Sequence, residues 1–519
     1  MNALARLTSL EHSYDQARQE FEHMVGFLSS TEASAMTHSE LEREIEKKGR
    51  QLMRKLLQEH IDERGPGTCD QGVTGADGIE RTRVRLQKRE IESIFGTIEK
   101  ERAGYAKPGA DSLHPLDAEL NLPKERYSLE LRRRVATEAA KSSFDETLAM
   151  IRDTTGGHVA KRQLEELTIR AAQDFDAFYE LRHAQAYPNK ASGSILVISA
   201  DGKGVVMRPE DLRDATRKAA EARTRKMGTR LSKGEKKNAK RMATVAAVYT
   251  TMPFVRQPED LIAKSPFQRQ GPARPRPERK RVWASLEKDP EQVIAEAVAE
   301  ARYRDPCGKK SWVALVDGNK DQLRILRRMA KKNRLDLTII VDLIHVIEYL
   351  WKAARAFHPE SGRQLEGWVE HRLGEILRGK AGVIAGGMRR SATVRGLTAC
   401  AREPVDKCAT YLRNHTPYLH YDRYLAQGFP VATGVIEGAC RHLVKDRMEK
   451  TGARWSLAGA EAVLRLRALR SSQDFEEYWI FHETCEYERN HKNLYAAGKV
   501  PPVSSSRSNR NSGRLKVIK

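Results

Sequence analysis

Two apolar runs in this chain each end at an aspartate that a glycine follows. The run at 196–200 ends at Asp201, and the run at 312–316 ends at Asp317. Short apolar runs bounded by turn residues are typical of buried β-strands. Neighbouring strands of one sheet can bring together carboxylates that are far apart in sequence, and carboxylates are natural ligands of divalent cations. The repeated pattern therefore predicts an α/β fold with an acidic site at one edge of its sheet.

The length and charge of the chain indicate a protein of several domains with a polyanionic partner. It has 519 residues, with 92 Lys and Arg against 70 Asp and Glu, and a net charge of +22. A basic excess of this size favours DNA, because neutralised phosphates release counterions. No stretch approaches the roughly 18 apolar residues of a membrane span, and residues 1–6 do not resemble a secretory signal. We therefore expect a cytoplasmic, nucleoid-associated protein with no membrane partner.

The six cysteines are scattered and form no CxxC pair. Such spacing is typical of reduced thiols in a cytosolic protein, so a structural zinc site is not indicated.

A series of strand-like and helical segments predicts the fold class. Its order is that of an RNase H-like core, a mixed five-stranded sheet with flanking helices. We expect this core to carry an all-helical insertion and to follow a mainly helical N-terminal region. The strand-like segments are 194–200, 204–208, 243–250, 312–316 and 337–341, with helical segments near 290–304 and 320–333.

The same patterns predict the domain organisation. We expect a helical and small-hairpin N-terminal region at 1–125, a helix-turn-helix-like DNA-binding region at 126–185, the first part of the core at 190–345, the helical insertion at 346–430, the closing helices of the core at 431–495, and a disordered basic tail at 496–519.

The N-terminal half contains two candidate DNA-binding features. Residues 81–86 alternate basic and apolar side chains, and a second candidate strand contains Ile91, Ile94 and Phe95, which together predict a small basic hairpin. Further on, a helix that ends near Thr155 precedes another helix.

The second of these helices has Lys161 and Arg162 in its first turns. A glycine-containing turn between two short helices is the outline of a helix-turn-helix, although helical hairpins with a purely structural role are also common. We expect Lys161 and Arg162 to contact DNA. The basic stretches 209–242 and 266–281 are either further phosphate contacts or solvated loops.

The chemistry that these acids suit is phosphodiester cleavage. Two Mg²⁺ ions, for which Mn²⁺ can substitute, would activate the attacking hydroxyl and stabilise the leaving oxygen. We expect Asp201, Asp317 and Glu437 to be the metal ligands. A single Asp-Gly pair can equally cap an ordinary turn, so the combination carries the prediction.

Asp342 and His345 form a second polar pair between these acids. They are three residues apart at the start of a predicted helix, so their side chains point the same way. Two interpretations remain open. Asp342 is an ordinary helix cap with a histidine packed below it, or the pair is catalytic and lies near the scissile phosphate. Asp342 also competes with Asp317 as the second metal ligand.

The predicted helix that carries Glu437 also carries cations. Arg441 and Lys445 follow at helical spacing and would hold the DNA backbone, although a simple salt bridge between Glu437 and Arg441 is the alternative. Beyond it, Arg454 could pair with a phosphate and Trp455 could stack on a base, or Trp455 could anchor the core.

Four blocks of the chain resemble ISKra-type bacterial insertion-sequence DDE transposases, over about residues 110 to 475. The last block is the most specific. The blocks are ISADGKGV at 198–205, ALVDG at 314–318, DLIHVIEYLW at 342–351, and TGVIEGACRHLVKDRM at 433–448 with GARWS at 452–456.

The resemblance implies an RNase H-like fold with a helical insertion before the last acid, as in Mutator-like transposases. It implies that Asp201, Asp317 and Glu437 form the DDE triad and that Asp342 and His345 match the D-x-x-H motif. The expected partners are double-stranded DNA, both terminal inverted repeats and target DNA, and further copies of the chain in a homo-oligomer.

We therefore expect a DNA transposase that cleaves and transfers strands. A DNA-binding regulator with an inactive core and a structure-specific nuclease are the alternatives.

Overall fold

The computed structural model describes residues 14–188, 192–222, 239–262, 273–358, 360 and 362–504. The chain divides into two compact units. Unit 1 contains the residues up to Phe175 together with those from Glu476 onward, and unit 2 contains Asp176–Phe475. Both the N-terminal part and the C-terminal part of the sequence therefore contribute to unit 1.

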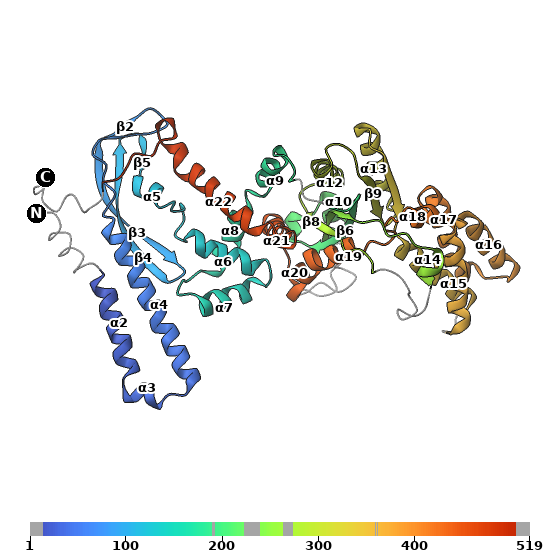
Figure 1. Cartoon of the computed structure of the whole chain (residues 1–519), viewed down its shortest axis with the longest axis horizontal. Helices are drawn as coiled ribbons and strands as arrows, with labels where there is room; N and C mark the ends of the chain where they lie inside the picture. Colours follow the sequence, from blue (N-terminus) through green and yellow to red (C-terminus); the bar gives the residue numbers. More distant parts are fainter. Residues whose placement is uncertain are drawn as a thin grey trace, which may run out of the picture. The chain divides into compact units, whose positions relative to one another are not determined.

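Unit 2 is built on a mixed five-stranded sheet in the order β10-β9-β6-β7-β8 (Figure 1). The first three strands along the chain pair antiparallel, whereas β9 runs parallel to β6 and β10 parallel to β9. The strands are β6 (Ile195–Val206), β7 (Lys240–Thr251), β8 (Glu278–Ser285), β9 (Ser311–Val316) and β10 (Leu337–Val341).

Two of the strand predictions need correction. The segments 194–200 and 204–208 belong largely to one strand, β6, because its pairing with β7 continues unbroken from Ile195 to Val206. Gly202 and Gly204 therefore lie inside a strand and do not end it. The third strand, β8, was missed because it begins within the Pro- and Arg-rich stretch. Its buried residues, Val282 and Trp283 among them, come only afterwards.

Helices cover this sheet where they were expected. Both α12 (Pro290–Arg304) and α13 (Lys320–Asn333) agree with the predicted segments. Asp289 caps α12 by accepting a hydrogen bond from the Gln292 N–H, and Pro290 occupies its first turn. Near the end of the unit, α21 (Leu457–Ser471) packs against β8.

Short helices complete unit 2. They are α10 (Asp214–Glu221), α11 (Pro258–Ile262), α19 (Gly434–Ala439) and α20 (Asp446–Met448), while α9 (Phe175–Ala184) spans the boundary between the units. Residues 223–238 of the basic stretch 209–242 lie outside the described residues.

The segment predicted as a helical insertion is helical, and it shares a core with the sheet. In the described residues from 343 to 433 every regular element is helical. Buried side chains of these helices, such as Leu350 and Leu412, belong to the same apolar cluster as Val313 and Ile340 of the sheet. The helices are α14 (Leu343–Phe357), α15 (Arg363–Leu377), α16 (Ala381–Val394), α17 (Ala399–His415) and α18 (Tyr421–Ala426).

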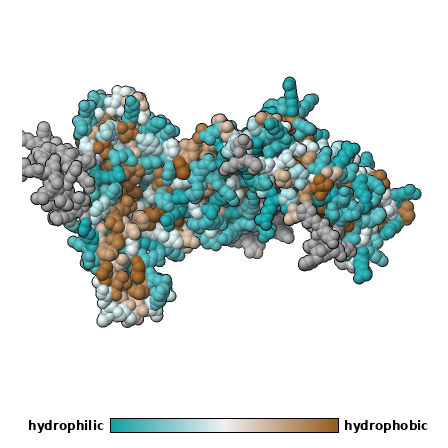
Figure 2. Space-filling model, in the orientation of Figure 1, coloured by the Kyte–Doolittle hydropathy of each residue, from teal (hydrophilic) through white to brown (hydrophobic). Residues whose placement is uncertain are grey.

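Unit 1 begins with a helical hairpin, in which α2 (Asp15–Leu28) packs along α4 (His38–Glu63) with the short α3 (Thr31–Ala35) between them (Figure 1). Apolar side chains lie exposed along it, as Figure 2 shows. Phe21 is 48% exposed and Met53 is 48% exposed.

A three-stranded antiparallel sheet follows the helical hairpin. Its strands are β3 (Arg83–Ser93), β4 (Gly96–Lys107) and β5 (Ala110–Leu113), and the smaller elements nearby are β1 (Val73–Thr74), β2 (Glu80–Arg81) and α5 (Pro115–Glu119).

The predicted basic hairpin was right in kind and wrong in its second strand. Ile91 belongs to β3, and Ile94 and Phe95 form the turn, so the second strand lies wholly beyond them. The N-terminal region is therefore less helical than expected.

Three further helices pack together in unit 1 and are joined by a helix from the end of the chain. They are α6 (Leu129–Ala139), α7 (Phe144–Thr154) and α8 (Lys161–Ala172), with α22 (Phe475–Asn490) as the distant partner. Arg132 on α6 is fully buried and forms ion pairs with Glu125 and Glu486. We grouped 431–495 with the core, but this buried network places α22 in unit 1.

The start of the predicted disordered tail is also attached to unit 1. Tyr495 pairs with Gly75 as an isolated β-bridge, and the Ser504 N–H donates to the Thr68 carbonyl at 2.7 Å. The expectation of disorder from 496 is therefore wrong for residues 496–504, and residues 505–519 lie outside the described residues. None of the described helices is long and apolar enough to cross a membrane.

Candidate active site

Asp201 lies within β6, and Asp317 directly follows the neighbouring parallel strand β9. Ser199 of β6 is in register with Leu315 of β9, and each acid is two residues further along the chain. Burial raises the pKa of Asp317, and the Asp201 charge raises it further, although a hydrogen bond from the Asn319 N–H opposes both. The sheet therefore brings these two carboxylates close enough for their charges to interact.

The helical insertion holds the loop that follows Asp317. The Tyr411 hydroxyl donates to the Asp317 carbonyl at 2.9 Å, and His415 Nε2 lies 2.8 Å from the Gly318 carbonyl. Gly318 has φ +89°, and a Cβ there would be 3.0 Å from the Tyr411 hydroxyl. A glycine is therefore required after this aspartate because the insertion packs directly onto the turn.

Asp342 follows β10 and caps α14. Its Oδ1 accepts from the Ile344 N–H at 2.9 Å, and its Oδ2 accepts from the Thr433 hydroxyl. His345 Nδ1 lies 3.4 Å from the same Oδ2, and Asp342 is 0% exposed. The helix-cap interpretation of Asp342 is therefore confirmed, and the catalytic interpretation of the pair stays a prediction.

The surroundings of His345 favour its protonated form. The hydrogen bond to Asp342 raises the pKa of His345, and the nearby charges of Asp317 and Glu348 raise it too, against the effect of burial. An imidazolium is therefore favoured beside the acids.

Glu437 is brought to the same place by α19. Ligand atoms of Asp342, His345 and Glu437 all lie within 4.8 Å of one another. Burial raises the pKa of Glu437, and so do the charges of Asp342 and Asp201, whereas His345 lowers it. All five predicted catalytic residues thus influence one another, but the tightest cluster contains Asp342 and His345 where Asp201 and Asp317 were expected.

Cys440 is a site residue that sequence reasoning missed. Its Sγ donates to Asp201 Oδ2 at 3.2 Å, while Asp201 Oδ1 accepts from the Gly202 N–H at 2.6 Å. Burial raises the pKa of this thiol, so it stays protonated as a donor. Its position three residues after Glu437 was the available signal.

The segment after Glu437 is π-helical from Cys440 to Lys445. Side chains spaced four residues apart do not stay on one face of an ordinary α-helix, because that helix has 3.6 residues per turn. The wider π turn keeps them closer to one face, so Ile436, Cys440 and Val444 are all buried while Glu437, Arg441 and Lys445 are all exposed. π-helical turns are frequent at functional sites because they re-aim side chains in this way.

The residues near this helix that were predicted to contact DNA differ in their exposure to solvent. Arg441 and Lys445 are exposed, and Arg441 lies 3.8 Å from Asp446, so the simple pair with Glu437 is not the one formed. Arg454 is also exposed.

Trp455 is only 5% exposed, so it cannot stack on a base as it stands. Its backbone pairs with Val206 and Arg208, and its Nε1 donates to the Met448 carbonyl at 3.1 Å. Of the two interpretations of Trp455, the core anchor is therefore correct.

Lys161 and Arg162 lie in the first turn of α8, in unit 1. Their side chains are 63% and 91% exposed, with Asp145 and Glu166 as ion-pair partners. The connection at 155–160 is attached to the hairpin turn, since the Gly156 N–H donates to the Ile94 carbonyl at 2.8 Å. The helix pair is thus fixed against β3 and presents both cations to solvent.

The donor set fits a hard divalent cation. The carboxylates of Asp342 and Glu437 cluster with the His345 imidazole, and the charge of Asp201 raises the pKa values of Asp317 and Glu437. Oxygen donors of this kind suit Mg²⁺ and Mn²⁺. The two candidates for the second ligand differ in exposure: the Asp342 carboxylate is fully buried and accepts hydrogen bonds on both oxygens, whereas Asp317 is partly exposed.

Comparison of this chain with models of protein families and with curated proteins found no match.

Proposed function

We propose that this protein is a DNA transposase of an insertion sequence, with an RNase H-like catalytic core in unit 2. The observation that carries the proposal is the position of Asp201 in β6 and of Asp317 directly after the adjacent parallel strand β9, with Glu437 of a later helix beside Asp342 and His345. The strand order β10-β9-β6-β7-β8 supports it, because antiparallel first strands followed by two parallel ones is the arrangement that the resemblance implies.

Asp201, Asp317 and Glu437 are the residues that would hold two Mg²⁺ ions, or Mn²⁺ in their place. Bound there, the ions would activate a water or 3′-hydroxyl and stabilise the leaving oxygen of the phosphodiester. Cys440 orients the Asp201 carboxylate, and Tyr411 and His415 fix the turn of Asp317.

His345 acts on the DNA phosphate in this proposal. Its Nδ1 faces Asp342, so its Nε2–H is the group left to donate to a phosphate oxygen. The exposed Arg441, Lys445 and Arg454 contribute charge that holds the DNA backbone. Lys161 and Arg162 of unit 1 contribute to binding the terminal inverted repeats, and the active form is a homo-oligomer that brings two ends together.

The test compares wild type with Asp201→Ala on the DNA that flanks the coding frame at its native locus. We expect wild type to nick this DNA with Mg²⁺ and the variant to bind it with nearly the same affinity without nicking. Arg390→Ala, an exposed change on α16, is the matched control and should behave as wild type.

The outcomes also separate the alternatives. Equal nicking by wild type and Asp201→Ala would reject the assignment of the site. Binding without any cleavage by wild type would indicate a regulator. Preferential cutting of branched DNA without inverted repeats would indicate a structure-specific nuclease.

A further inference from the structure

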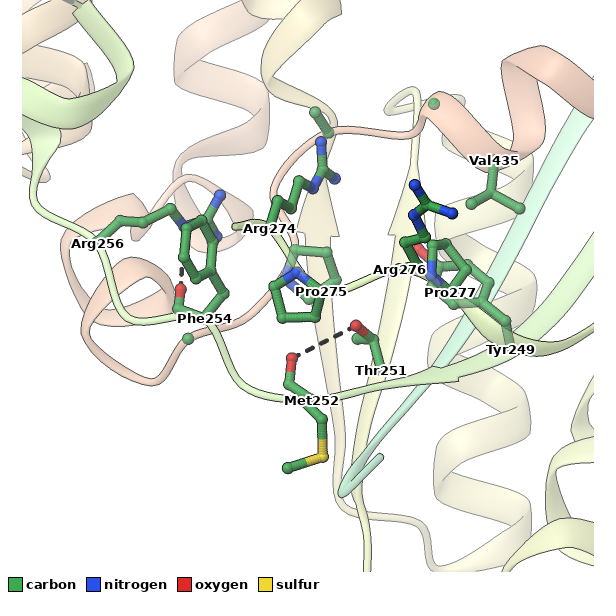
Figure 3. Close-up of a pocket in the computed structure, with 14 residues that line it drawn as sticks. Tyr249, Thr251, Met252, Phe254, Arg256, Arg274, Pro275, Arg276, Pro277 and Val435 are labelled. Carbon is green, nitrogen blue, oxygen red and sulfur yellow. Dashed lines mark hydrogen bonds between the residues drawn. The ribbon is translucent and has the colours of Figure 1, made fainter. Parts of the chain in front are cut away.

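A cavity of about 290 Å³ lies in unit 2 beside the helix that carries Glu437 (Figure 3). Three segments form it. They are the residues that follow β7, the residues that precede β8, and residues 428–435, which lead into α19. Gly434 and Val435 line the cavity and are only two or three residues from Glu437.

Backbone contacts fix the first wall of this cavity. The Phe254 N–H donates to the Gly428 carbonyl at 2.9 Å, and the Arg256 N–H donates to the Leu425 carbonyl at 3.2 Å. Gly428 has φ +72°, and a Cβ there would lie 2.5 Å from the Phe254 nitrogen. The wall is therefore built into the fold.

The cavity is strongly positive. Arg256, Arg274 and Arg276 line it, and no carboxylate is among its described lining residues. Burial lowers the pKa of Arg256 to about 10, and the Arg274 charge lowers it further. Within the described residues neither Arg274 nor Arg276 forms an ion pair, and Figure 3 shows their guanidinium groups extending to the same side. These cations are available to an anion.

The remaining lining is apolar and flat-sided. Phe254, Pro275, Pro277 and Val435 contribute to it, and Tyr249, which is 3% exposed, closes one end. Within the described residues no hydrogen bond reaches the Tyr249 hydroxyl. Rings and prolines beside arginines suit a ligand with a flat hydrophobic part and a phosphate.

We infer that this cavity binds one unpaired nucleotide of the DNA strand held at the catalytic edge. Its base lies against the Phe254, Pro275 and Val435 walls, and its phosphates lie against Arg274 and Arg276. The inference rests on the proposed function for the DNA strand itself, and it adds a site that recognises a base next to the acids.

The test measures whether bases, beyond phosphates, contribute to binding. Two fluorescent single strands of equal length are compared by anisotropy at one salt concentration, one of thymidines and one of abasic residues. We expect wild type to bind the thymidine strand at least ~5-fold more tightly, the gain typical of one stacked base. Ala432→Trp, which fills the cavity, should abolish this preference and leave the affinity for the abasic strand unchanged.

Further variants separate the effect of added bulk from the loss of a cavity wall or of its cations. Val383→Trp adds the same ring at a side chain that is 72% exposed on α16, and it should retain the preference. Phe254→Ala removes a wall and should lose the preference without adding bulk. Arg274→Ala with Arg276→Ala should weaken both strands alike, and Arg390→Ala should weaken neither.

Equal binding of both strands by wild type, or a preference that survives Ala432→Trp and Phe254→Ala, would overturn the inference. Displacement of the thymidine strand by equimolar dTMP would also overturn it, because the cavity would then take a free nucleotide. Mg²⁺-dependent nicking is measured in parallel. Nicking without base preference would reject only the nucleotide-binding role of the cavity. Base preference without nicking would reject only the transposase proposal.

Discussion

Two aspartates at the ends of adjacent parallel strands occupy different environments. Asp317 is partly exposed and is held by one backbone N–H, whereas Asp342 is fully buried with hydrogen bonds to both oxygens. A ligand needs a free lone pair that faces the metal. From this difference in exposure we propose that Asp317 binds the metal and that Asp342 orients His345.

The first prediction compares Asp317→Asn with Asp342→Asn in Mg²⁺-dependent strand transfer. We expect no detectable product with Asp317→Asn, because an amide is a poor ligand for the cation. Asp342→Asn should lower the rate by about 10–100-fold, as loss of a supporting partner typically does. If only Asp342→Asn abolishes the reaction, the second ligand is Asp342 and the assignment is wrong.

The second prediction concerns stability without metal. The pKa of Asp317 is raised above 3.8, so its charged form destabilises the fold at neutral pH. Asp317→Asn keeps an oxygen for the Asn319 N–H and should raise Tm by roughly 2 °C, the shift that about 1 kcal/mol gives in a domain of this size.

The pH dependence of this gain has a defined sign. The gain should be absent below pH 3.8, where the wild-type carboxyl is protonated in both the folded and the unfolded state, and it should grow as pH rises from 3.8 through the raised pKa. Mg²⁺ should stabilise wild type more than the variant. Equal melting temperatures at neutral pH without metal would show that burial and the Asp201 charge do not destabilise the charged form of Asp317.

The third prediction separates two neighbours in sequence. Trp455→Ala should destabilise unit 2 by about 3–5 kcal/mol because it leaves a cavity under a buried ring. Arg454→Ala should leave stability unchanged and weaken DNA binding, because its side chain is exposed. Urea unfolding and DNA affinity are measured for both, and a stable Trp455→Ala variant would contradict the core role.

At the scale of elements, the strands and helices with a clear apolar pattern were predicted from the sequence. Elements without such a pattern were missed or divided. The strand that ends at Asp317, the helices at 290–304 and 320–333 and the helical insertion were all expected, since each has an unbroken apolar pattern. β8 was missed because it begins among prolines and arginines, and β6 was divided because Gly202 and Gly204 resemble a turn.

The prediction of the candidate site from sequence was limited in a similar way. Spacing identified Asp342 and His345 as a pair and Glu437 as a distant acid, and the structure brings all three together. The hydrogen bond from Cys440 to Asp201 and the clamp of Tyr411 on Asp317 join residues far apart in sequence. No local pattern reports such contacts, and the π turn at 440–445 has no propensity signal of its own.

At the scale of the whole molecule, unit 1 is discontinuous in sequence. Residues 476–504 complete it, and the buried Arg132 depends on Glu486 of α22. One cut in the sequence therefore cannot separate unit 1 from unit 2. Unit 2 is by contrast one continuous segment.

The fourth prediction tests this dependence. Glu486→Gln should destabilise unit 1 by about 3 kcal/mol, because it leaves the buried Arg132 charge under-compensated. Burial raises the pKa of Glu486, but the Arg132 charge outweighs this effect and holds the pKa below 4.5. The difference from wild type should therefore be full above pH 4.5 and disappear as pH falls through the lowered pKa.

Thermal unfolding across pH measures this effect. Glu488→Gln, a change at a half-exposed side chain on the same helix with Lys492 as its partner, is the control and should alter Tm little. A Glu486→Gln variant as stable as wild type at neutral pH would show that α22 does not complete unit 1.

The central claim is that the acids of unit 2 join DNA strands in a metal-dependent reaction. The most direct measurement mixes wild-type protein, end DNA from the native locus with a free 3′-hydroxyl, and a target plasmid, and then sequences any junctions. We predict covalent junctions between that 3′ end and the plasmid with Mg²⁺ or Mn²⁺, and none with EDTA or with Asp201→Ala. Junctions that form equally with Asp201→Ala, or wild-type protein that binds the ends and joins nothing in either metal, would contradict the account.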